Sequence, residues 1–325
     1  MLRRALVVGI DHYPTLGDLG GCVNDAVALG PLLARNEDNS LNFEVRTLKA
    51  PVDSGHVSRD DLLEALDRLF APGVHMSLLY FAGHGASVAN GADVTLVTSD
   101  GTEQTLGVRF SEVLEKINGC DQEVAVILDC CFSGGAGGVP GVITSGLMLR
   151  QGVSILTASR ADQTSAETPA GRGKFSAYLE GALEGGAADT LGHLTLAGLY
   201  SYLSEAFGSW DQRPMFKANV DQLQEIRRCE PAVPLATLRK LPRWFPTPDH
   251  TFPLDPSYEP DKRESGLEAH PEHEAVFKQL QKCASAKLVE PVGADHMYFA
   301  AMQNEGCQLT PLGKHYRHMA SEERL

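Results

Sequence analysis

Several common functional signatures are missing from this sequence. No apolar run approaches the roughly 20 residues that a membrane-spanning helix needs. The apolar stretch 5–10 is short and meets Asp11, so the sequence indicates no secretory signal peptide. There is no CxxC pair and no HExxH motif, which argues against a structural or hydrolytic zinc site. The glycine-rich segment 134–146 is not followed by Gly-Lys-Ser/Thr, which argues against a phosphate-binding loop.

An excess of positive charge is also missing. The net charge is −14, which argues against an electrostatic nucleic-acid interface. Residues 226–325 hold 13 basic and 14 acidic residues, so nearly all of the negative charge lies in residues 1–225. An acidic front domain favours basic peptides as partners, and we predict neither a nucleic-acid nor a membrane partner.

The seven cysteines are odd in number and irregularly spaced, which does not suggest a disulfide framework. They are expected to be reduced thiols, and the predicted location is the cytoplasm. Free thiols of this kind are either small buried hydrophobes or reactive groups.

Hydrophobic segments alternate with helical patterns through the first two thirds of the chain. Strands are predicted at 4–10, 43–48, 76–82, 94–97, 124–129, 153–158 and 214–220, and helices at 24–35, 58–70, 111–118, 174–184 and 195–207. This order predicts an α/β fold with a mostly parallel central sheet and helices on both faces. Reactive groups in such sheets gather at the carboxyl ends of the strands.

The composition changes after residue 225. Eight prolines fall between 231 and 260, which predicts a Pro-rich linker over 226–264. We therefore expect three parts: a domain over 1–225, this linker, and a small C-terminal α+β module over 265–325. The last part is either a winged-helix-like module or a helical cap on the first domain.

Two strands end at glycine-flanked reactive side chains. The segment 78–85 (LLYFAGHG) ends at His84, and the segment 124–135 (VAVILDCCFSGG) carries Cys130 and Cys131. A His and a Cys that lie far apart in sequence but close in space are a candidate base and nucleophile. Each residue alone is more often an ordinary core or surface residue. Their shared placement at strand ends favours the catalytic interpretation.

The two segments resemble the His and Cys motifs of the caspase and metacaspase superfamily, and the prokaryotic metacaspases in particular. The resemblance covers roughly residues 4–220 and implies a caspase-like fold and a cysteine endopeptidase. In the family motif an Asp and one further residue precede the nucleophile, which makes Cys131 the nucleophile and His84 the general acid/base. It also implies that the N–H groups of Gly85 and Cys131 hold the oxyanion. Neighbouring strand residues face opposite ways, so Cys130 is expected to pack inward.

The resemblance further implies an acidic pocket that accepts Arg or Lys. The segment 21–26 (GCVNDA) matches the family segment that supplies one pocket carboxylate, here Asp25, and Asp129 matches the other. Two carboxylates can pair with one guanidinium. Asp25 could instead complement the dipole at a helix N-terminus. Ala82 stands where many metacaspases have Ser, which leaves the preference between Arg and Lys open.

Two further segments belong to the same resemblance. Residues 156–167 (LTASRADQTSAE) match the family's substrate groove, in which Ser159 and Asp162 are candidate substrate-binding residues. The segment 134–146 reads as a mobile loop after the nucleophile, and Arg150 beyond it is a candidate processing site. Arg172 and Lys174 fall in a second predicted loop.

No cofactor is predicted. Calcium-dependent metacaspases use acidic residues near the nucleophile, and none occurs between Phe132 and Arg160, so calcium dependence is not expected. The leading hypothesis is an Arg/Lys-directed endopeptidase that stays latent until an upstream protease, or the enzyme itself, cuts it. The setting suggested by the resemblance is prokaryotic antiviral defence or programmed cell death. The alternatives are a catalytically silent scaffold with this fold, or a related peptidase of different specificity.

Overall fold

The computed structural model describes residues 2–87, 93–133, 148–158, 172–207, 214–260 and 268–325, with only the backbone for residues 131–133. The chain forms two compact units. The first comprises residues 1–188 and 193–230, and the second comprises 189–192 and 231–325.

The first unit is built on one mostly parallel sheet, as the sequence predicted. Its main strands are β1 (Arg3–Ile10), β2 (Glu44–Ala50), β3 (Met76–Ser87), β6 (Glu123–Ser133), β7 (Val153–Thr157) and β9 (Met215–Asn219). They lie in the order β2-β1-β3-β6-β7-β9, and β9 alone runs antiparallel to its neighbour. The predicted strand at 94–97 is β4 (Val94–Val97), which joins the end of β3 and pairs with β5 (Gly107–Arg109).

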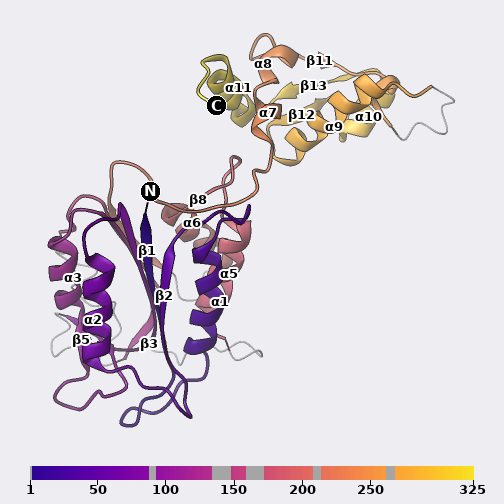
Figure 1. The fold of residues 1–325 in the computed structure, drawn as a ribbon. Coiled ribbons are helices and arrows are strands. Elements are labelled where there is room, and N and C mark those ends of the chain that lie inside the picture. Colours follow the sequence, from indigo (N-terminus) through magenta and orange to yellow (C-terminus); the bar gives the residue numbers. More distant parts are fainter. Residues whose placement is uncertain (1, 88–92, 134–147, 159–171, 208–213, 261–267) are drawn as a thin grey trace. The chain divides into compact units, whose positions relative to one another are not determined.

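Helices cover both faces of this sheet (Figure 1). One face carries α2 (Arg59–Phe70) and α3 (Phe110–Asn118), and the other carries α1 (Cys22–Ala34), α5 (Lys174–Gly181) and α6 (Leu196–Ala206). The predicted start of α2 is confirmed: Ser58 accepts from the Asp61 N–H, and the Asp61 carboxylate accepts from the Ser58 N–H. Helix α5 is shorter than predicted, because a π-helical turn, η2 (Ala182–Gly186), follows it and contains Gly185 at φ 120°.

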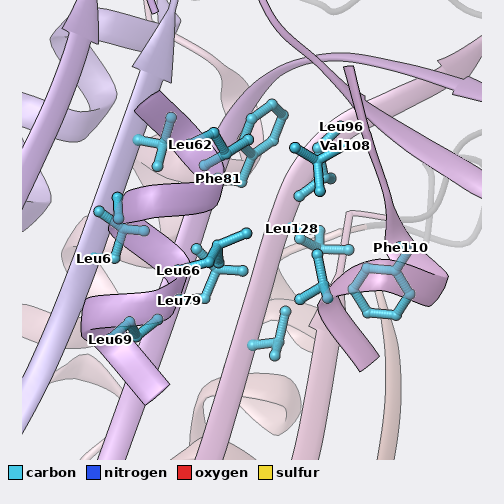
Figure 2. Packing of buried hydrophobic residues seen from close by; sticks show 14 of the residues in the cluster. Leu6, Leu62, Leu66, Leu69, Leu79, Phe81, Leu96, Val108, Phe110 and Leu128 are labelled. Atoms are coloured by element: carbon cyan, nitrogen blue, oxygen red, sulfur yellow. The ribbon is translucent and has the colours of Figure 1, made fainter. Parts of the chain in front are cut away.

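Alternating side chains of the same strands build two separate cores. In β3, Leu79 and Phe81 pack toward α2 and α3, as Figure 2 shows, whereas Leu78 and Tyr80 belong to the core under α1, α5 and α6. Residues on both faces of the central strands are almost completely buried. This explains why these strands read as continuous hydrophobic runs in the sequence.

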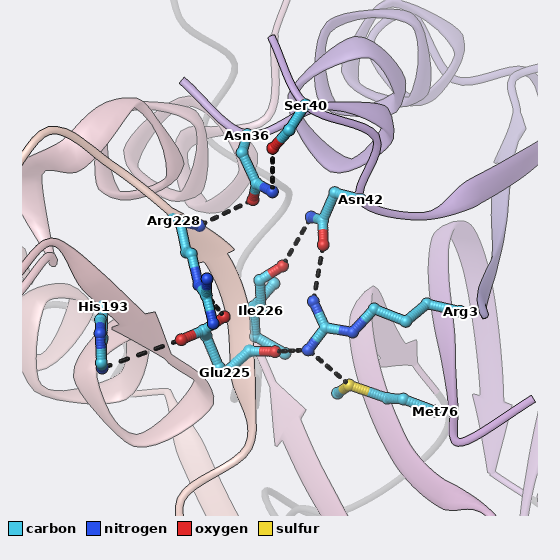
Figure 3. Close-up of polar contacts among 9 residues, drawn as sticks. All are labelled: Arg3, Asn36, Ser40, Asn42, Met76, His193, Glu225, Ile226 and Arg228. Carbon is cyan, nitrogen blue, oxygen red and sulfur yellow. Dashed lines mark hydrogen bonds and ion pairs between the residues drawn. The ribbon is translucent and has the colours of Figure 1, made fainter. Parts of the chain in front are cut away.

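A polar network joins the amino-terminal end of β1 to a two-stranded sheet formed by β8 (His193–Thr195) and β10 (Glu225–Arg228) (Figure 3). Arg3 Nη1 donates to Asn42 Oδ1 at 2.6 Å, and Arg3 Nη2 donates to the Glu225 carbonyl. Asn42 Nδ2 donates to the Ile226 carbonyl at 2.8 Å. Segments separated by 184 and 222 residues in sequence are thereby held together within the first unit.

The second unit contains both helices and strands. Its elements are α7 (Leu235–Leu238), α8 (Leu241–Trp244), β11 (Phe252–Pro253), the 3-10 helix η3 (Pro256–Tyr258), α9 (Pro271–Ser285), β12 (Val289–Val292), α10 (Met297–Met302), β13 (Gly306–Leu309) and α11 (Pro311–Ser321). The strands form an antiparallel sheet in the order β11-β13-β12. That this unit resembles a winged helix stays a prediction.

The predicted linker over 226–264 is wrong. Val233, Trp244 and Leu254 are buried in the same core as Phe277 and Leu280, so the proline-rich residues from 231 onward belong to the second unit. Residues 226–230 belong to the first unit, where β10 pairs with β8. Three of the prolines, Pro234, Pro242 and Pro256, stand at the starts of α7, α8 and η3, where a fixed φ is favourable and a missing N–H costs nothing.

None of the described helices has the length and apolar character to cross a membrane.

Candidate active site

Strands β3 and β6 bring positions 84 and 131 together. Their parallel register runs from Met76↔Glu123 to Ala86↔Ser133, and within it His84 pairs with Cys131. Residues 47 positions apart in sequence are therefore neighbours on adjacent strands, near the carboxyl ends of both. The predicted adjacency of the two positions is confirmed.

The His84 imidazole is held from two sides. Its Nε2 lies 3.0 Å from the Gly17 carbonyl oxygen, and its ring packs against Tyr13 with 4.6 Å between ring centroids. A carbonyl can only accept, so this contact assigns the proton to Nε2. The other ring nitrogen, Nδ1, is then the one that can take up a proton from a neighbouring thiol.

Tyr13 also fixes the backbone beside the histidine. The His84 N–H donates to the Tyr13 hydroxyl at 2.9 Å, and burial raises the pKa of Tyr13 well above its ordinary value, so the phenol stays neutral. A Cβ on Gly83 would lie 2.3 Å from the Tyr13 hydroxyl oxygen. Glycine at position 83 is therefore needed for this close approach.

The other cysteines near the site are poor candidates for a nucleophile. Cys130 is 2% exposed and belongs to the core on the α2 side, as predicted. Burial, followed by the charges of Asp129, Asp11 and Asp25, raises the pKa of Cys22 well above its ordinary value. A thiol in that environment stays protonated and unreactive. The Cys131 side chain lies outside the described part of the molecule.

Asp129 lies on β6 two positions before Cys131, and it is bound by a chain of hydroxyl groups. Ser176 Oγ donates to Asp129 Oδ2, and the Tyr80 hydroxyl lies 2.6 Å from Ser176 Oγ. Since the single Ser176 proton goes to the carboxylate, Tyr80 donates to Ser176. Burial raises the pKa of Tyr80 well above its ordinary value, and the charges of Asp129 and Asp25 add to this, so Tyr80 remains a donor.

Asp25 lies in the first turn of α1 and is 2% exposed. Arg172 Nε donates to its Oδ1, and the Gly173 N–H donates to its Oδ2 at 3.2 Å. Burial raises the pKa of Asp25, and these two contacts only partly offset that effect. The Asp25 carboxylate therefore binds Arg172, which is 147 residues away in sequence, in addition to any interaction with the helix dipole.

Gly173 shows how close the two predicted pocket carboxylates are. A Cβ at position 173 would lie 3.1 Å from Asp25 Oδ2 and 3.3 Å from Asp129 Oδ2. Any side chain at 173 would thus press on both acids, so the Asp25 and Asp129 carboxylates lie near each other beside Gly173. Their function in binding substrate stays a prediction.

The remaining predicted residues have mixed outcomes. Gly85 pairs with Phe132 of β6 and with Leu96 of β4, next to His84, and its oxyanion role stays a prediction. Ser159, Asp162 and the segment 134–146 lie outside the described residues. Arg150 is half-buried: its guanidinium donates to the Ile117 carbonyl at 2.8 Å and to the Gln122 carbonyl at 2.6 Å. Its role in processing stays a prediction.

Sequence reasoning missed four groups at this site: the Gly17 carbonyl, Tyr13, Ser176 and Arg172. The first two lie in a loop after β1 that carries no motif. Ser176 falls inside a predicted helix. Its hydroxyl donates to Asp129, whereas Ala82, which stands where many metacaspases have Ser, has no hydroxyl to donate. Arg172 is predicted to lie in a second loop; in the structure it contacts Asp25 and lies just before Gly173, the N-cap of α5.

Within the described ranges, no three His, Cys, Asp or Glu side chains are arranged to hold a metal ion. Independence from calcium stays a prediction.

Residues 2–222 match the caspase-domain family model. Similar curated proteins are Metacaspase-1 of Schizosaccharomyces pombe, which is 26% identical over 175 residues (48% of this chain and 41% of that protein), and Metacaspase-3 of Trypanosoma cruzi, which is 27% identical over 172 residues (46% of each). Metacaspase-7 of Arabidopsis thaliana is 26% identical over 150 residues, or 42% of this chain and 36% of that protein. The matches span less than half the length of these relatives.

The fold has a counterpart among solved structures. A crystal structure of a Geobacter sulfurreducens protein, a structural genomics target, superposes with a TM-score of 0.51 and 17% identity, covering 71% of this chain and all of that one. At this identity the likeness concerns the fold alone.

Proposed function

Because this chain belongs to the family of caspase-domain peptidases, we propose that it is a cysteine endopeptidase in which Cys131 and His84 act as a dyad. The observation that carries the proposal is the register between β3 and β6, which pairs the two positions. The Gly17 carbonyl supports it, because it leaves His84 Nδ1 as the proton acceptor.

In the proposed reaction His84 Nδ1 takes the Cys131 proton and the thiolate attacks the scissile carbonyl carbon. The N–H groups of Gly85 and Cys131 stabilise the negative charge on the carbonyl oxygen. His84 then gives the proton to the leaving amine as the C–N bond breaks, which leaves a thioester on Cys131. A water molecule, deprotonated by His84, hydrolyses the thioester and restores the thiol.

The proposed specificity is for Arg, and less strongly for Lys, before the scissile bond. Two carboxylates that approach one glycine support this, since a guanidinium can pair with several acidic oxygens and an acidic side chain would be repelled. The proposed substrates are accordingly proteins and peptides with basic cleavage residues.

Incubation of a peptide library with the wild type and with Cys131→Ala, read by mass spectrometry, tests both proposals. We expect cuts after Arg and Lys with the wild type and none with Cys131→Ala. Cleavage after Asp by the wild type would contradict the specificity. The absence of cleavage under any condition would instead favour a silent scaffold.

Asp25→Ala tests the pocket directly. Removing the carboxylate should raise the barrier for Arg substrates by about 2–5 kcal/mol, which is the usual loss when a buried charge loses its partner. In kcat/KM this is roughly 30- to 5,000-fold. Asp67→Ala is a matched control, since the Asp67 carboxylate on α2 pairs with Lys116 at an exposed position. An equal loss in both variants would speak against the pocket.

We also propose that the intact chain is latent and that cutting after Arg150 activates it. This proposal rests on the position of Arg150 after the glycine-rich segment 134–146 and on the basic specificity proposed above. The Arg150 contacts with the Ile117 and Gln122 carbonyls would have to open before a protease could bind the residue. The two fragments should remain together, because β6 and β7 pair along five residues on either side of the cut.

Arg150→Ala tests the switch. The variant should remain uncut and weakly active after treatment with active enzyme, while the wild type gains activity. An uncut variant with full activity would show that activity is controlled elsewhere in the chain.

The resemblance also leads us to propose prokaryotic antiviral defence or programmed cell death as the setting. Survival of a phage-challenged host that carries the wild type or Cys131→Ala tests it.

A further inference from the structure

The proposed pocket already contains a basic side chain from the chain itself. Arg172 precedes α5, its side chain is 17% exposed, and its Nε donates to Asp25 Oδ1. The Gly173 N–H donates to the other oxygen, Asp25 Oδ2, at 3.2 Å. Both oxygens of the carboxylate that should receive a substrate guanidinium are therefore in use.

The other end of the Arg172 guanidinium has a second anchor. Nη1 lies 2.9 Å from Glu180 Oε2 on α5, and the Glu180 side chain is 29% exposed, against 2% for Asp25. Arg172 thus bridges a buried acid and a more exposed one. If Arg172 moves away from Asp25, its charge can still be balanced by Glu180.

The charge of Arg172 is secure in this setting. Burial alone would lower its pKa, but the hydrogen bond and charge of Asp25, together with Glu180, outweigh burial and raise it. A permanent cation at Asp25 has the same chemistry as the group that the pocket is proposed to recognise. An incoming Arg side chain must therefore displace Arg172 or bind without Asp25.

We propose that Arg172 is a specificity-determining residue that competes with the basic side chain of the substrate for Asp25. This inference rests on the proposed function. It follows that small Arg compounds, which bind only through the pocket, are weak ligands. Longer peptides can displace Arg172 because contacts along their backbone add binding energy.

The test compares Arg172→Gln and Arg172→Lys with Arg68→Gln, a control that removes an exposed Arg paired with Glu64 on α2. Kinetics at pH 8 with a peptide carrying a single Arg should show a KM at least about tenfold lower in Arg172→Gln, with little change in kcat. Arg172→Lys keeps the charge but loses the Nε donor, and its KM should lie between that of Arg172→Gln and the wild type. Arg68→Gln should match the wild type.

Binding provides a readout that does not depend on turnover. Calorimetry with arginine amide on Cys131→Ala should give a dissociation constant about tenfold lower when Arg172→Gln is added. An unchanged or higher KM together with unchanged binding would overturn the inference and make Arg172 a support for Asp25. If thermal unfolding shows that Arg172→Gln does not fold, Arg172→Lys provides the test: a KM below that of the wild type supports the inference, and an unchanged or higher KM overturns it.

The failure of the inference can be distinguished from the failure of the proposed function. If the wild type cleaves after Arg and Asp25→Ala does not, the pocket stands whatever the Arg172 variants do. If no variant cleaves after Arg and none binds arginine amide, both the pocket and the inference are wrong.

Discussion

The two faces of the central sheet are built from alternate residues of the same strands, yet they differ in chemistry. Toward α2 and α3 the core is mainly apolar, as with Leu66, Leu79 and Phe81 in Figure 2, and the buried Ser77 there is a neutral hydroxyl that donates to the Leu69 carbonyl. Toward α1 and α5 the core also contains polar groups, among them Tyr80, Ser176 and Asp25. One face anchors the sheet by packing, and the other combines packing with the proposed pocket.

The comparison shows how neighbouring residues in one strand can have unrelated tasks. Cys130 is buried among the apolar residues of the α2 face, whereas Asp129, the residue before it, receives a hydrogen bond from Ser176 of α5. Strand alternation separates the two environments along β6, and Tyr13 is the α2-side residue that reaches across to the His84 ring. Changes on one face should therefore alter stability without specificity, and changes on the other should do the reverse.

The largest expected effect comes from replacing each of the two neighbouring cysteines, Cys130 and Cys131, by Ala in turn. Cys131→Ala should lower kcat by at least about a thousandfold, the usual scale for loss of a nucleophile. Cys130→Ala should keep most of the activity and lower the free energy of unfolding by about 1 kcal/mol, through the loss of a small buried group. Peptidase kinetics and urea unfolding measure the two effects. An inactive Cys130→Ala enzyme that is folded would break the comparison.

Labelling with a thiol reagent extends this test. Burial raises the pKa of Cys283 and of Cys307 to about 12, so both thiols should react slowly at neutral pH. Mass spectrometry of the native protein should find Cys131 labelled before these two.

A smaller effect is expected from the apolar face. Leu66 is fully buried beneath the sheet, and Leu66→Ala should lower the free energy of unfolding by about 2–5 kcal/mol. At temperatures where the variant is folded, its kcat/KM for Arg peptides should match the wild type within about twofold. A specific loss of activity would mean that the two faces are coupled.

The smallest effect concerns pH. Burial raises the pKa of Asp25 above 3.8, and the Arg172 hydrogen bond and charge lower it in part. Binding of Arg needs the ionised carboxylate, so activity should fall as the pH drops through this raised pKa. Loss of Arg172 should move that acid limb to higher pH, because the Arg172 hydrogen bond and charge are what lower the pKa of Asp25.

The measurement is kcat/KM against pH for the wild type, Arg172→Gln and Arg68→Gln. Both variants keep His84, so a displacement seen only in Arg172→Gln reports on Asp25. Acid limbs that superimpose in all three proteins would place Asp25 outside the pocket.

The raised pKa of Asp25 has a second consequence. The contribution of Asp25 to the free energy of unfolding falls as the pH rises from the ordinary pKa of an Asp to the raised pKa of Asp25, because the folded state holds the proton more tightly in that range.

The sequence was sufficient for the features that depend on local pattern. Continuous apolar runs ending at glycine predicted β3 and β6, and with them the adjacency of His84 and Cys131. The helix predicted over 58–70 is α2, which begins with Ser58 as its N-cap. These features follow from side-chain period and turn chemistry, which a single segment contains in full.

Features that depend on distant partners could not be predicted in this way. The pairing of Arg172 with Asp25 spans 147 residues, and the contact of His84 with the Gly17 carbonyl uses a backbone group that no residue type reveals. The proline-rich segment was misread because a proline that starts a short helix and one that extends a linker look alike in sequence. Its buried Trp244 and Phe245 were the signal that it belongs to a core.

The strand order has a consequence for how the protein is made. A ribosome releases β3 and β6, which carry His84 and Cys131, before β7 and β9 exist, although β7 covers the open edge of β6 and β9 covers that of β7. Until residue 219 has emerged, the nascent chain presents an unpaired hydrophobic strand edge, which favours association with other chains. Lys174–Gly181, which carries Ser176 to Asp129, is made after β7 and before β9. Translation order thus produces every residue of the site before β9 covers the last open edge of the sheet, so the nascent chain must keep that edge from other chains while the site is already present.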